Sequence, residues 1–407
     1  MVWVKRIILF LLVILSFGCI LKFVKNVPYF YIFIELFLIL MVIAIKSRKS
    51  PNQKALLINF AAIVLALGLG EAYFAGWQEF GLFQNDRKVV QEGTYTLGSF
   101  FKNDQVRGYA IAENARTSSK LTIGNKVIYD VIYTTNQNGL RISPHDTNLY
   151  FRNQKKDFKN VVFFGCSFTL GEGVNDDETL PYLFEKKSAG EYRSYNFGLY
   201  GYGPHQMLRI LETGLLDSII TDRKPSIAIY QALMEHIPRS SGKYPYFLWD
   251  VNGPHYELTS SGQVEYAGKF NDSFISKIKF KLYRELAKSY LLSRNTWMKR
   301  LIGWDINKSD MDLFVKIIIK SKQIFTTKYG GDFYVLIWPD DSENYKYVIS
   351  KLAENHISII TTDTIFNKYD DPKEKYRLKI DNHPTKLAYE RIAKYLLSYV
   401  NKQSFNK

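Results

Sequence analysis

The sequence predicts an α/β protein built on a three-layer doubly wound parallel sheet, preceded by an N-terminal helical transmembrane segment and a small β-rich lead-in. Three observations lead to this prediction. From residue 158 onward, short apolar runs typical of buried strands alternate with helical patterns. Before residue 76, three long apolar runs follow one another closely. Between these regions, residues 121–135 alternate apolar and polar side chains around a Gly-Asn turn.

The composition indicates a folded protein and excludes several classes. The chain has 407 residues, of which 46% are apolar and 15% aromatic, so a large core is possible and general disorder is excluded. Two cysteines exclude a disulfide framework. The formal net charge is +15, but no basic block is longer than a few residues. We therefore expect a mildly basic surface with basic membrane flanks, and no nucleic-acid partner.

The first 76 residues predict three transmembrane helices, over residues 7–24, 29–45 and 55–75. The loop of residues 46–54 is the most basic of the segment, and the bias of Lys and Arg toward the cytoplasm places it inside. The third span then carries the chain outward. We expect an integral protein of the inner or plasma membrane, with the lipid bilayer as a partner and residues 77–407 periplasmic or extracellular.

The rest of the chain divides into a β-rich lead-in, residues 77–155, and an α/β domain, residues 156–407. In the lead-in, Gly124-Asn125 predicts the turn of a hairpin. In the domain we expect strands over residues 161–164, 192–196, 227–233, 332–338 and 357–361, and helices from residue 180 and over residues 204–216, 311–328 and 386–400.

An insertion at about residues 239–310 interrupts the alternation of strands and helices. It contains turn residues around Gly262, which predict a hairpin, and then a basic helical stretch. Its aromatic residues allow two interpretations, a wall on which sugars stack or ordinary packing within the insertion. These residues are Tyr244, Tyr246, Phe247 and Trp249.

Ser167 stands directly after the first predicted parallel strand, in the segment Gly165-Cys166-Ser167. Ligand sites of doubly wound sheets lie outside the carboxyl ends of the strands. A tight turn there exposes the hydroxyl, and the following helix directs backbone N–H groups at a developing oxyanion. Ser167 is thus either a nucleophile or a serine that caps this helix. Cys166 is a less favoured nucleophile.

A serine nucleophile needs a base, and His383 stands out among six histidines. It lies in Asp381-Asn382-His383-Pro384, after the last predicted strand and before the closing helix. That position puts it on the same edge of the sheet as Ser167. Asp381 can hold the imidazole in one tautomer and stabilise the imidazolium. The alternative is a surface histidine beside a helix-starting proline.

These motifs resemble the conserved blocks of the SGNH/GDSL hydrolase superfamily over residues 158–400. Residues 165–174, GCSFTLGEGV, resemble its first block, and residues 196–203, NFGLYGYG, its second. Asp381, His383 and Pro384 resemble its fifth. The resemblance implies that Ser167 is the nucleophile, His383 the base and Asp381 the orienting acid. It also implies an oxyanion hole that includes the backbone N–H groups of Ser167 and Gly198.

Three features depart from the family pattern. Cys166 replaces the Asp that usually precedes the serine, and the Asp-x-His spacing is one residue shorter than the common form. No Asn occupies the third block, which here runs over residues 227–239. We expect His236 to supply the missing third oxyanion donor. Arg239, three residues later, either binds an anionic substrate group or pairs within the fold.

The expected function is that of a membrane-anchored serine esterase with a Ser-His-Asp triad. Its substrate would be an acylated glycan of the cell envelope or a related small ester. The alternatives are an O-acyltransferase on envelope polysaccharide, and an inactive SGNH domain that binds glycans or supports assembly. No metal or cofactor is expected, because no His, Cys and carboxylate cluster has ligand spacing. The sequence does not indicate an oligomeric state.

Overall fold

The computed structural model of the chain describes residues 28–46, 50–78, 89–93, 100–147, 157–366, 375–379 and 381–405. Within these residues the chain forms two compact units. One contains the N-terminal helices together with residues 278–305 of the insertion, and the other contains residues 88–277 and 306–407. The first predicted span, residues 7–24, lies outside the described residues.

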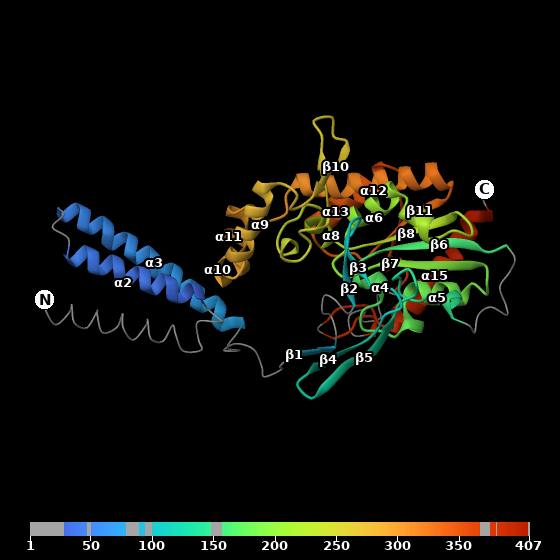
Figure 1. Cartoon of the computed structure of the whole chain (residues 1–407), viewed down its shortest axis with the longest axis horizontal. Coiled ribbons are helices and arrows are strands. Elements are labelled where there is room, and N and C mark those ends of the chain that lie inside the picture. The colour runs from blue at the N-terminus through green and yellow to red at the C-terminus, as the bar shows by residue number, and fades with distance from the viewer. Residues whose placement is uncertain are drawn as a thin grey trace. The chain divides into compact units, whose positions relative to one another are not determined.

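The larger unit is built on a five-stranded parallel sheet in the order β12-β11-β8-β6-β7 (Figure 1). The chain forms β6 first, adds β7 on one side, and then crosses back to add β8 on the other. The predicted doubly wound α/β fold is therefore confirmed. The strands are β6 (Lys159–Gly165), β7 (Tyr192–Gly198), β8 (Pro225–Ala232), β11 (Asp332–Ile337) and β12 (Ser358–Thr361).

Helices cover both faces of this sheet, because successive side chains of a strand point to opposite faces. Val162 and Phe164 of β6 belong to one core cluster, and Val161 and Phe163 to the other. The first face packs on α6 (Pro204–Thr213), α12 (Lys308–Tyr329) and α13 (Glu343–Glu354), and the second on α5 (Leu180–Lys187) and α15 (Lys386–Phe405). The result is the predicted three-layer arrangement. Three shorter helices complete the unit: α4 (Ser167–Leu170), α7 (Leu215–Ile219) and α8 (His236–Ser240).

The lead-in is made of antiparallel strands. The β4–β5 pair forms the hairpin predicted at Gly124-Asn125, and Gly124 has the left-handed φ of +58° that such a turn requires. A third strand, β1, extends this sheet, while β2 and β3 form a separate hairpin. The strands are β1 (Val89–Gly93), β2 (Phe101–Asp104), β3 (Gly108–Ile111), β4 (Arg116–Ile123) and β5 (Lys126–Thr134).

The lead-in has its own apolar core, and this core reaches the edge of the sheet formed by the carboxyl ends of β6 and β7. Phe100, Val131 and Tyr133 of the lead-in pack with Leu170 and Leu199, which follow β6 and β7. The lead-in therefore supports the loops at the carboxyl ends of two central strands.

The insertion contains the hairpin predicted near Gly262, formed by β9 (Pro254–Leu258) and β10 (Val264–Lys269). Tyr256 and Val264 of the hairpin pack on α6 and α12. The basic stretch that follows forms α9 (Phe274–Leu286), α10 (Tyr290–Arg294) and α11 (Thr296–Leu301). Residues 278–305 of this stretch group with the N-terminal helices, whereas the sequence placed the whole insertion in the hydrolase domain.

The smaller unit contains two long apolar helices, α2 (Pro28–Lys46) and α3 (Pro51–Gln78). Both are long and apolar enough to cross a membrane, judged by length and composition. Glu71 of α3 is fully buried and accepts hydrogen bonds from Ser289 Oγ at 2.8 Å, Tyr290 N at 2.7 Å and Leu291 N at 2.9 Å. These bonds explain why residues 278–305 group with α3.

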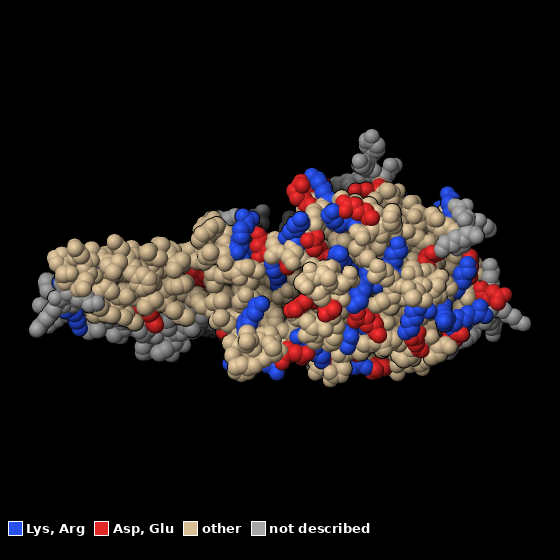
Figure 2. Space-filling model, turned by 90° about the horizontal axis from the view of Figure 1, so that it is seen from above, with Lys and Arg blue, Asp and Glu red and all other residues tan. Residues whose placement is uncertain are grey.

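The two long helices differ from the larger unit in surface chemistry. In Figure 2 the end of the molecule formed by α2 and α3 shows few charged side chains, whereas Lys and Arg are mixed with Asp and Glu over the visible face of the larger unit. On that face no large region carries one sign of charge.

Candidate active site

The strand-to-helix turn after β6 presents Ser167 as the first residue of α4. Gly165 has a φ of +152°, and a Cβ on it would lie 2.3 Å from Thr169 Oγ1 and 2.9 Å from the Gln231 carbonyl oxygen. Only glycine fits this turn. Because β6 lies between β7 and β8, where the direction of winding reverses, Ser167 lies at the switch point of the sheet, where ligands bind in such folds.

The predicted serine, histidine and aspartate lie together. His383 Nε2 is 2.7 Å from Ser167 Oγ, and Nδ1 is 2.8 Å from Asp381 Oδ1. The second contact is an ion pair whose N–H is not aligned with the carboxylate oxygen. Hydrogen bonds of this kind commonly tighten when substrate binds.

The short Asp-x-His spacing has a local explanation. Asn382 has a φ of +59°, in the left-handed region that Asn tolerates better than most residues. The backbone is also fixed by a hydrogen bond from Leu378 N to the His383 carbonyl oxygen, at 2.7 Å.

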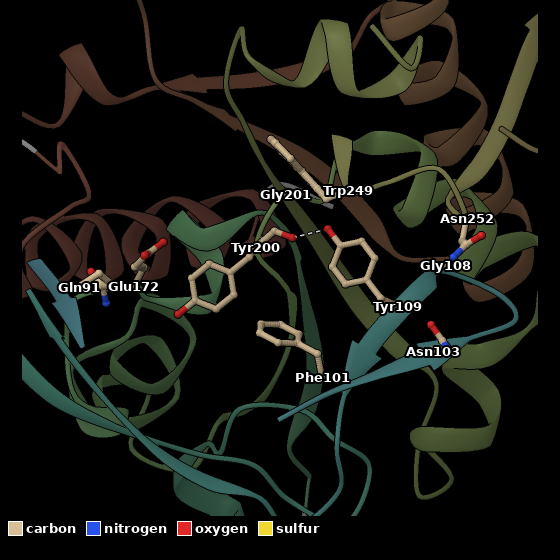
Figure 3. Close-up of a pocket in the computed structure, with 10 residues that line it drawn as sticks. All are labelled: Gln91, Phe101, Asn103, Gly108, Tyr109, Glu172, Tyr200, Gly201, Trp249 and Asn252. Carbon is tan, nitrogen blue, oxygen red and sulfur yellow. Dashed lines mark hydrogen bonds between the residues drawn. The ribbon is translucent and has the colours of Figure 1, made fainter. Parts of the chain in front are cut away.

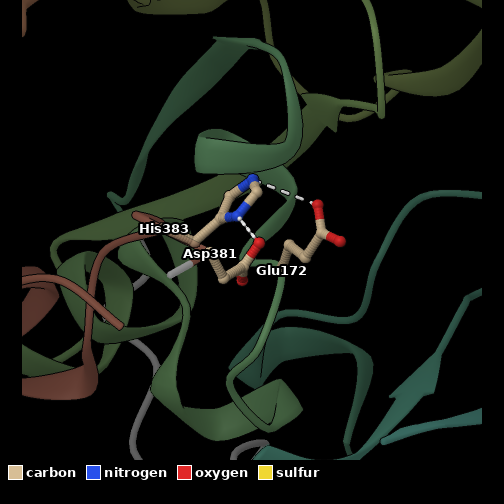
Figure 4. Close-up of side chains that lie close together, drawn as sticks. All are labelled: Glu172, Asp381 and His383. Atoms are coloured by element: carbon tan, nitrogen blue, oxygen red, sulfur yellow. Dashed lines mark ion pairs between the residues drawn. The ribbon is translucent and has the colours of Figure 1, made fainter. Parts of the chain in front are cut away.

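A second carboxylate contacts the same imidazole. Glu172 Oε2 lies 3.0 Å from His383 Nε2 (Figure 4). This is the same nitrogen that contacts Ser167 Oγ. Together with Asp381, Glu172 and His383 form a group that could hold a metal ion. The two carboxylates, however, contact opposite nitrogens of one ring. We interpret the contacts as ion pairs to an imidazolium.

These carboxylates change the proton affinity of His383. Burial by itself lowers the pKa of His383, but Asp381 and Glu172 outweigh it and raise the pKa to about 10. At neutral pH, in the structure as it stands, the ring is therefore mostly protonated. It can act as a base only in its minor neutral form, or after Glu172 releases it.

Buried polar contacts hold the nucleophile turn in place. Arg141 is 1% exposed, and its guanidinium donates to the carbonyl oxygens of Leu170 at 2.9 Å, Gly171 at 2.5 Å and Val174 at 2.6 Å. It also donates to Asp176 Oδ1 at 2.9 Å. The side chain thus fixes the loop that carries Glu172.

The expected oxyanion donors are arranged differently from the prediction. Gly198 has no room for a side chain, since a Cβ would lie 2.6 Å from Leu170 N, but its own N–H donates to Asn196 Oδ1 at 3.0 Å. This donor is therefore already occupied. The Ser167 backbone lies at the start of α4, and its role in an oxyanion hole stays a prediction.

His236 lies in a different environment from the one its predicted role requires. It is fully buried, its Nδ1 is 2.6 Å from the Tyr230 hydroxyl, and burial, Arg239 and His205 keep its pKa well below the usual range. It is not among the described residues that line the cavity at Ser167. Its role as oxyanion donor stays a prediction without support from this geometry.

The cavity at Ser167 has a volume of about 340 Å³. Two arginines line it, Arg239 from the third block and Arg377 from the segment before Asp381. Arg239 donates to the Tyr202 carbonyl oxygen at 2.8 Å and stacks on the Tyr246 ring, while its buried Nε has no hydrogen-bond partner. Cys166 is fully buried and is not a lining residue.

Sequence reasoning missed three residues of this site. Glu172 lies inside the first block, and its position five residues after the candidate nucleophile is a signal from which a role could have been predicted. Arg141 lies in the lead-in, and its sequence position does not show that it supports the loop after Ser167. Arg377 lies four residues before Asp381, and nothing in the local pattern distinguishes it from other surface arginines.

No family model and no curated protein matches the chain. Several solved structures are similar to part of the chain. A proposed lipolytic protein of the G-D-S-L family from Desulfitobacterium hafniense has 14% identity, covers 59% of this chain and 98% of its own, and has a TM-score of 0.34.

Two further structures give similar values. A member of the lipolytic protein G-D-S-L family from Veillonella parvula has 14% identity and a TM-score of 0.32, over 59% of this chain and 97% of its own. A psychrotrophic esterase from Pseudoalteromonas sp. has 12% identity and a TM-score of 0.32, over 61% of this chain and 100% of its own. At this level of similarity, we base the function on the geometry of the site alone.

Proposed function

We propose that the chain is a serine esterase with the triad Ser167, His383 and Asp381. The observation that carries this proposal is the pair of contacts made by one imidazole, 2.7 Å to the Ser167 hydroxyl and 2.8 Å to the Asp381 carboxylate. Serine, histidine and acid in this order form the arrangement that activates a hydroxyl for attack on an ester.

In the first half of the reaction, Ser167 Oγ attacks the ester carbonyl carbon while its proton passes to His383 Nε2. Asp381 stabilises the imidazolium. The C–O bond to the alcohol then breaks, and His383 returns the proton to the leaving oxygen. In the second half, water attacks the acyl-serine, again with His383 as base, and releases the acid and free Ser167.

We further propose that the substrate is a small O-acyl group on a glycan of the cell envelope. A sugar hydroxyl that replaced water in the second half would make the same site an O-acyltransferase. An inactive binding domain is the third possibility, and it predicts no reaction at Ser167.

We propose that α2 and α3 anchor the enzyme in the membrane. Their apolar composition supports this, as do the exposed apolar side chains of the neighbouring helices α9 and α11. Ile278 and Leu282 are 53% and 54% exposed, and Trp297 and Leu301 are 67% and 65% exposed. Lysines and arginines lie between them, a composition typical of helices at a lipid surface.

Labelling with a fluorophosphonate probe tests the catalytic proposal. The full chain in detergent should be labelled, and Ser167→Ala should abolish both labelling and hydrolysis of a short-chain aryl ester. Cys166→Ala should retain part of both. Ser218→Ala changes an exposed serine of α7 and serves as the control. Absence of labelling in the folded wild-type chain would favour the inactive binding domain.

A further inference from the structure

A second hollow of about 560 Å³ lies beside the catalytic residues, and it is larger than the cavity at Ser167. We call it the aromatic cleft. Its volume lies within the roughly 300–1,000 Å³ of ordinary ligand pockets. It is lined by Gln91, Phe101, Asn103, Gly108, Tyr109, Glu172, Tyr200, Gly201, Trp249 and Asn252 (Figure 3).

Most of the cleft is built by segments outside the α/β core. Phe101, Asn103 and Tyr109 come from the β2–β3 hairpin of the lead-in, and Trp249 and Asn252 from the insertion. The two segments touch closely, since a Cβ on Gly108 would lie 2.8 Å from the backbone of Gly253. The lead-in and the insertion, which are separate segments of the chain, therefore together form one cleft.

The rings in the cleft are held in fixed positions. The Tyr109 hydroxyl donates to the Tyr200 carbonyl oxygen, and Phe101 packs edge-on against the Tyr200 ring with centroids 5.9 Å apart. Gly201 has a φ of +71°, and a Cβ on it would lie 2.6 Å from Trp249 Nε1 and 2.8 Å from the Tyr109 hydroxyl. Glycine at this position allows both rings to approach one backbone.

Trp249 is nevertheless 47% exposed, whereas its neighbours Tyr246 and Phe247 are buried. Of the aromatic residues predicted as a sugar-stacking wall, Trp249 is therefore the one that lines the cleft. An exposed indole held against a backbone offers a flat apolar face and a polar N–H, which suits a ligand that is apolar on one face and polar at its edge.

The polar groups of the cleft narrow the class of ligand. Gln91, Asn103 and Asn252 bring neutral amides that both donate and accept hydrogen bonds. Glu172 is the one charged residue among the described residues that line the cleft. A polyanion would be repelled by this carboxylate. An alkyl chain would remove water from the carboxylate and the amides without offering them hydrogen bonds in its place. Hydroxyl-rich neutral sugar rings fit both constraints.

Glu172 connects the cleft to the catalytic site. In Figure 3 Glu172 and Gln91 lie at one end of the cleft, Asn103 and Asn252 at the other, and the rings between them. The Glu172 carboxylate is 3.0 Å from His383 Nε2. A sugar that occupied the cleft would therefore have its nearest ring next to the triad.

We propose that the aromatic cleft binds a neutral, O-acylated sugar chain. In this complex Glu172 accepts a hydrogen bond from a hydroxyl of the sugar ring nearest to Ser167. This inference rests on the proposed esterase function. When the Glu172 carboxylate turns from His383 Nε2 to the sugar hydroxyl, Nε2 keeps its contact with Ser167 Oγ alone. The cleft thus selects the polymer, and a bound sugar removes the ion pair that weakens His383 as a base.

The test compares a polymer substrate with a small one. Full-length wild type, Trp249→Ala and Trp249→Phe are assayed on acetylated xylo-oligosaccharides and on an aryl acetate. The ratio of the two kcat/KM values should fall at least tenfold in Trp249→Ala and recover in large part in Trp249→Phe. Trp297→Ala, on α11 and 67% exposed, is the matched control and should keep the wild-type ratio.

Binding is measured separately with Ser167→Ala, by quenching of tryptophan fluorescence. Neutral acetylated xylo-oligosaccharides should bind more tightly than a polyuronate of similar length, and Trp249→Phe should remove the quenching. An unchanged ratio in Trp249→Ala, or tighter binding of the polyuronate, would overturn the cleft proposal. Fluorophosphonate labelling of the wild type and of the Trp249 and Trp297 variants reports on the triad independently, so failure of the esterase proposal is distinguished from failure of this one.

Discussion

At the residue scale, the unusual feature is an imidazole between two carboxylates. In a simple triad one acid faces Nδ1 and leaves Nε2 to the serine. Here Glu172 contacts Nε2 as well, at 3.0 Å against 2.7 Å for Ser167 Oγ. The charged form of His383 is stabilised, and the base is weakened at neutral pH in the absence of substrate.

The pH dependence of the reaction follows from this arrangement. His383 acts as a base only when neutral, and its pKa is raised to about 10. The kcat/KM for an aryl acetate should therefore increase with pH through the neutral range and level off near pH 10. Glu172→Gln removes one stabilising charge and should shift the midpoint to lower pH by at least one unit.

The control for this pH profile is Glu178→Gln, which alters an ion pair with Lys386 away from the His383 ring. It should leave the midpoint where it is in the wild type. If Glu172→Gln has the wild-type midpoint, the contact with Nε2 does not govern the base.

A second prediction concerns which side chain supplies the third oxyanion donor, Arg239 or His236. Arg239 lines the cavity at Ser167, whereas His236 is bonded to Tyr230 and is not a lining residue. Arg239→Gln should lower kcat by about 100-fold, the typical effect of losing one oxyanion donor, with a smaller change in KM. His236→Gln should have the smaller effect on kcat. Steady-state kinetics with an aryl acetate decide between them, and the reverse order would support His236 as the donor.

At the scale of elements, the β-rich lead-in supports the catalytic turn. Arg141 follows β5. Its guanidinium donates to three carbonyl oxygens, at the last residue of α4 and in the loop after it, and to Asp176 Oδ1. On the other side of the turn, the Tyr389 hydroxyl of α15 donates to the Phe168 carbonyl oxygen at 2.7 Å. The nucleophile is therefore held by elements from both ends of the catalytic unit.

Loss of Arg141 should damage stability and catalysis together. Arg141→Met leaves Asp176 and the carbonyl oxygens without their buried partner, a loss that typically costs about 3–5 kcal/mol. Thermal unfolding should occur at a clearly lower temperature, and fluorophosphonate labelling below that temperature should be at least tenfold slower. Arg116→Met, at an exposed position of β4, is the matched control. Normal labelling in Arg141→Met would show that the loop holds its geometry without this residue.

At the scale of the whole molecule, the proposed anchor determines on which side of the membrane the site works. The basic loop of residues 46–54 predicts a cytoplasmic connection between the second and third spans, and hence a catalytic unit outside the cytoplasm. An envelope glycan would then be within reach of the cleft.

Reporter fusions test this topology. Alkaline phosphatase fused after residue 407 should be active, because it folds only outside the cytoplasm, and a fluorescent protein that matures only in the cytoplasm should be dark. The same two reporters fused at residue 48 should give the opposite result. An active cytoplasmic reporter at the C-terminus would invert the topology and remove envelope glycans from the possible substrates.

The order of strands and helices and the candidate triad could be predicted from local patterns in the chain. Buried parallel strands are continuous apolar runs, so residues 161–164 and 227–233 were recognisable without contacts. Ser167 and His383 could be predicted because each follows the carboxyl end of a parallel strand. The carboxyl ends of parallel strands lie at the same edge of the sheet. Gly124-Asn125 predicted its hairpin because few residues adopt the backbone of such a turn.

Which side chains share a cavity could not be predicted from local patterns, because it depends on contacts between distant segments. Glu172 contacts His383 although 211 positions of the chain separate them. Trp249 and Tyr109 line one cleft although they are 140 positions apart, so no local periodicity predicts either arrangement. The same holds for His236, whose place near the third strand is visible in the sequence, while its burial against Tyr230 depends on rotamers and packing. Local patterns predict the course of the backbone, but the position of a side chain depends on every element that packs around it.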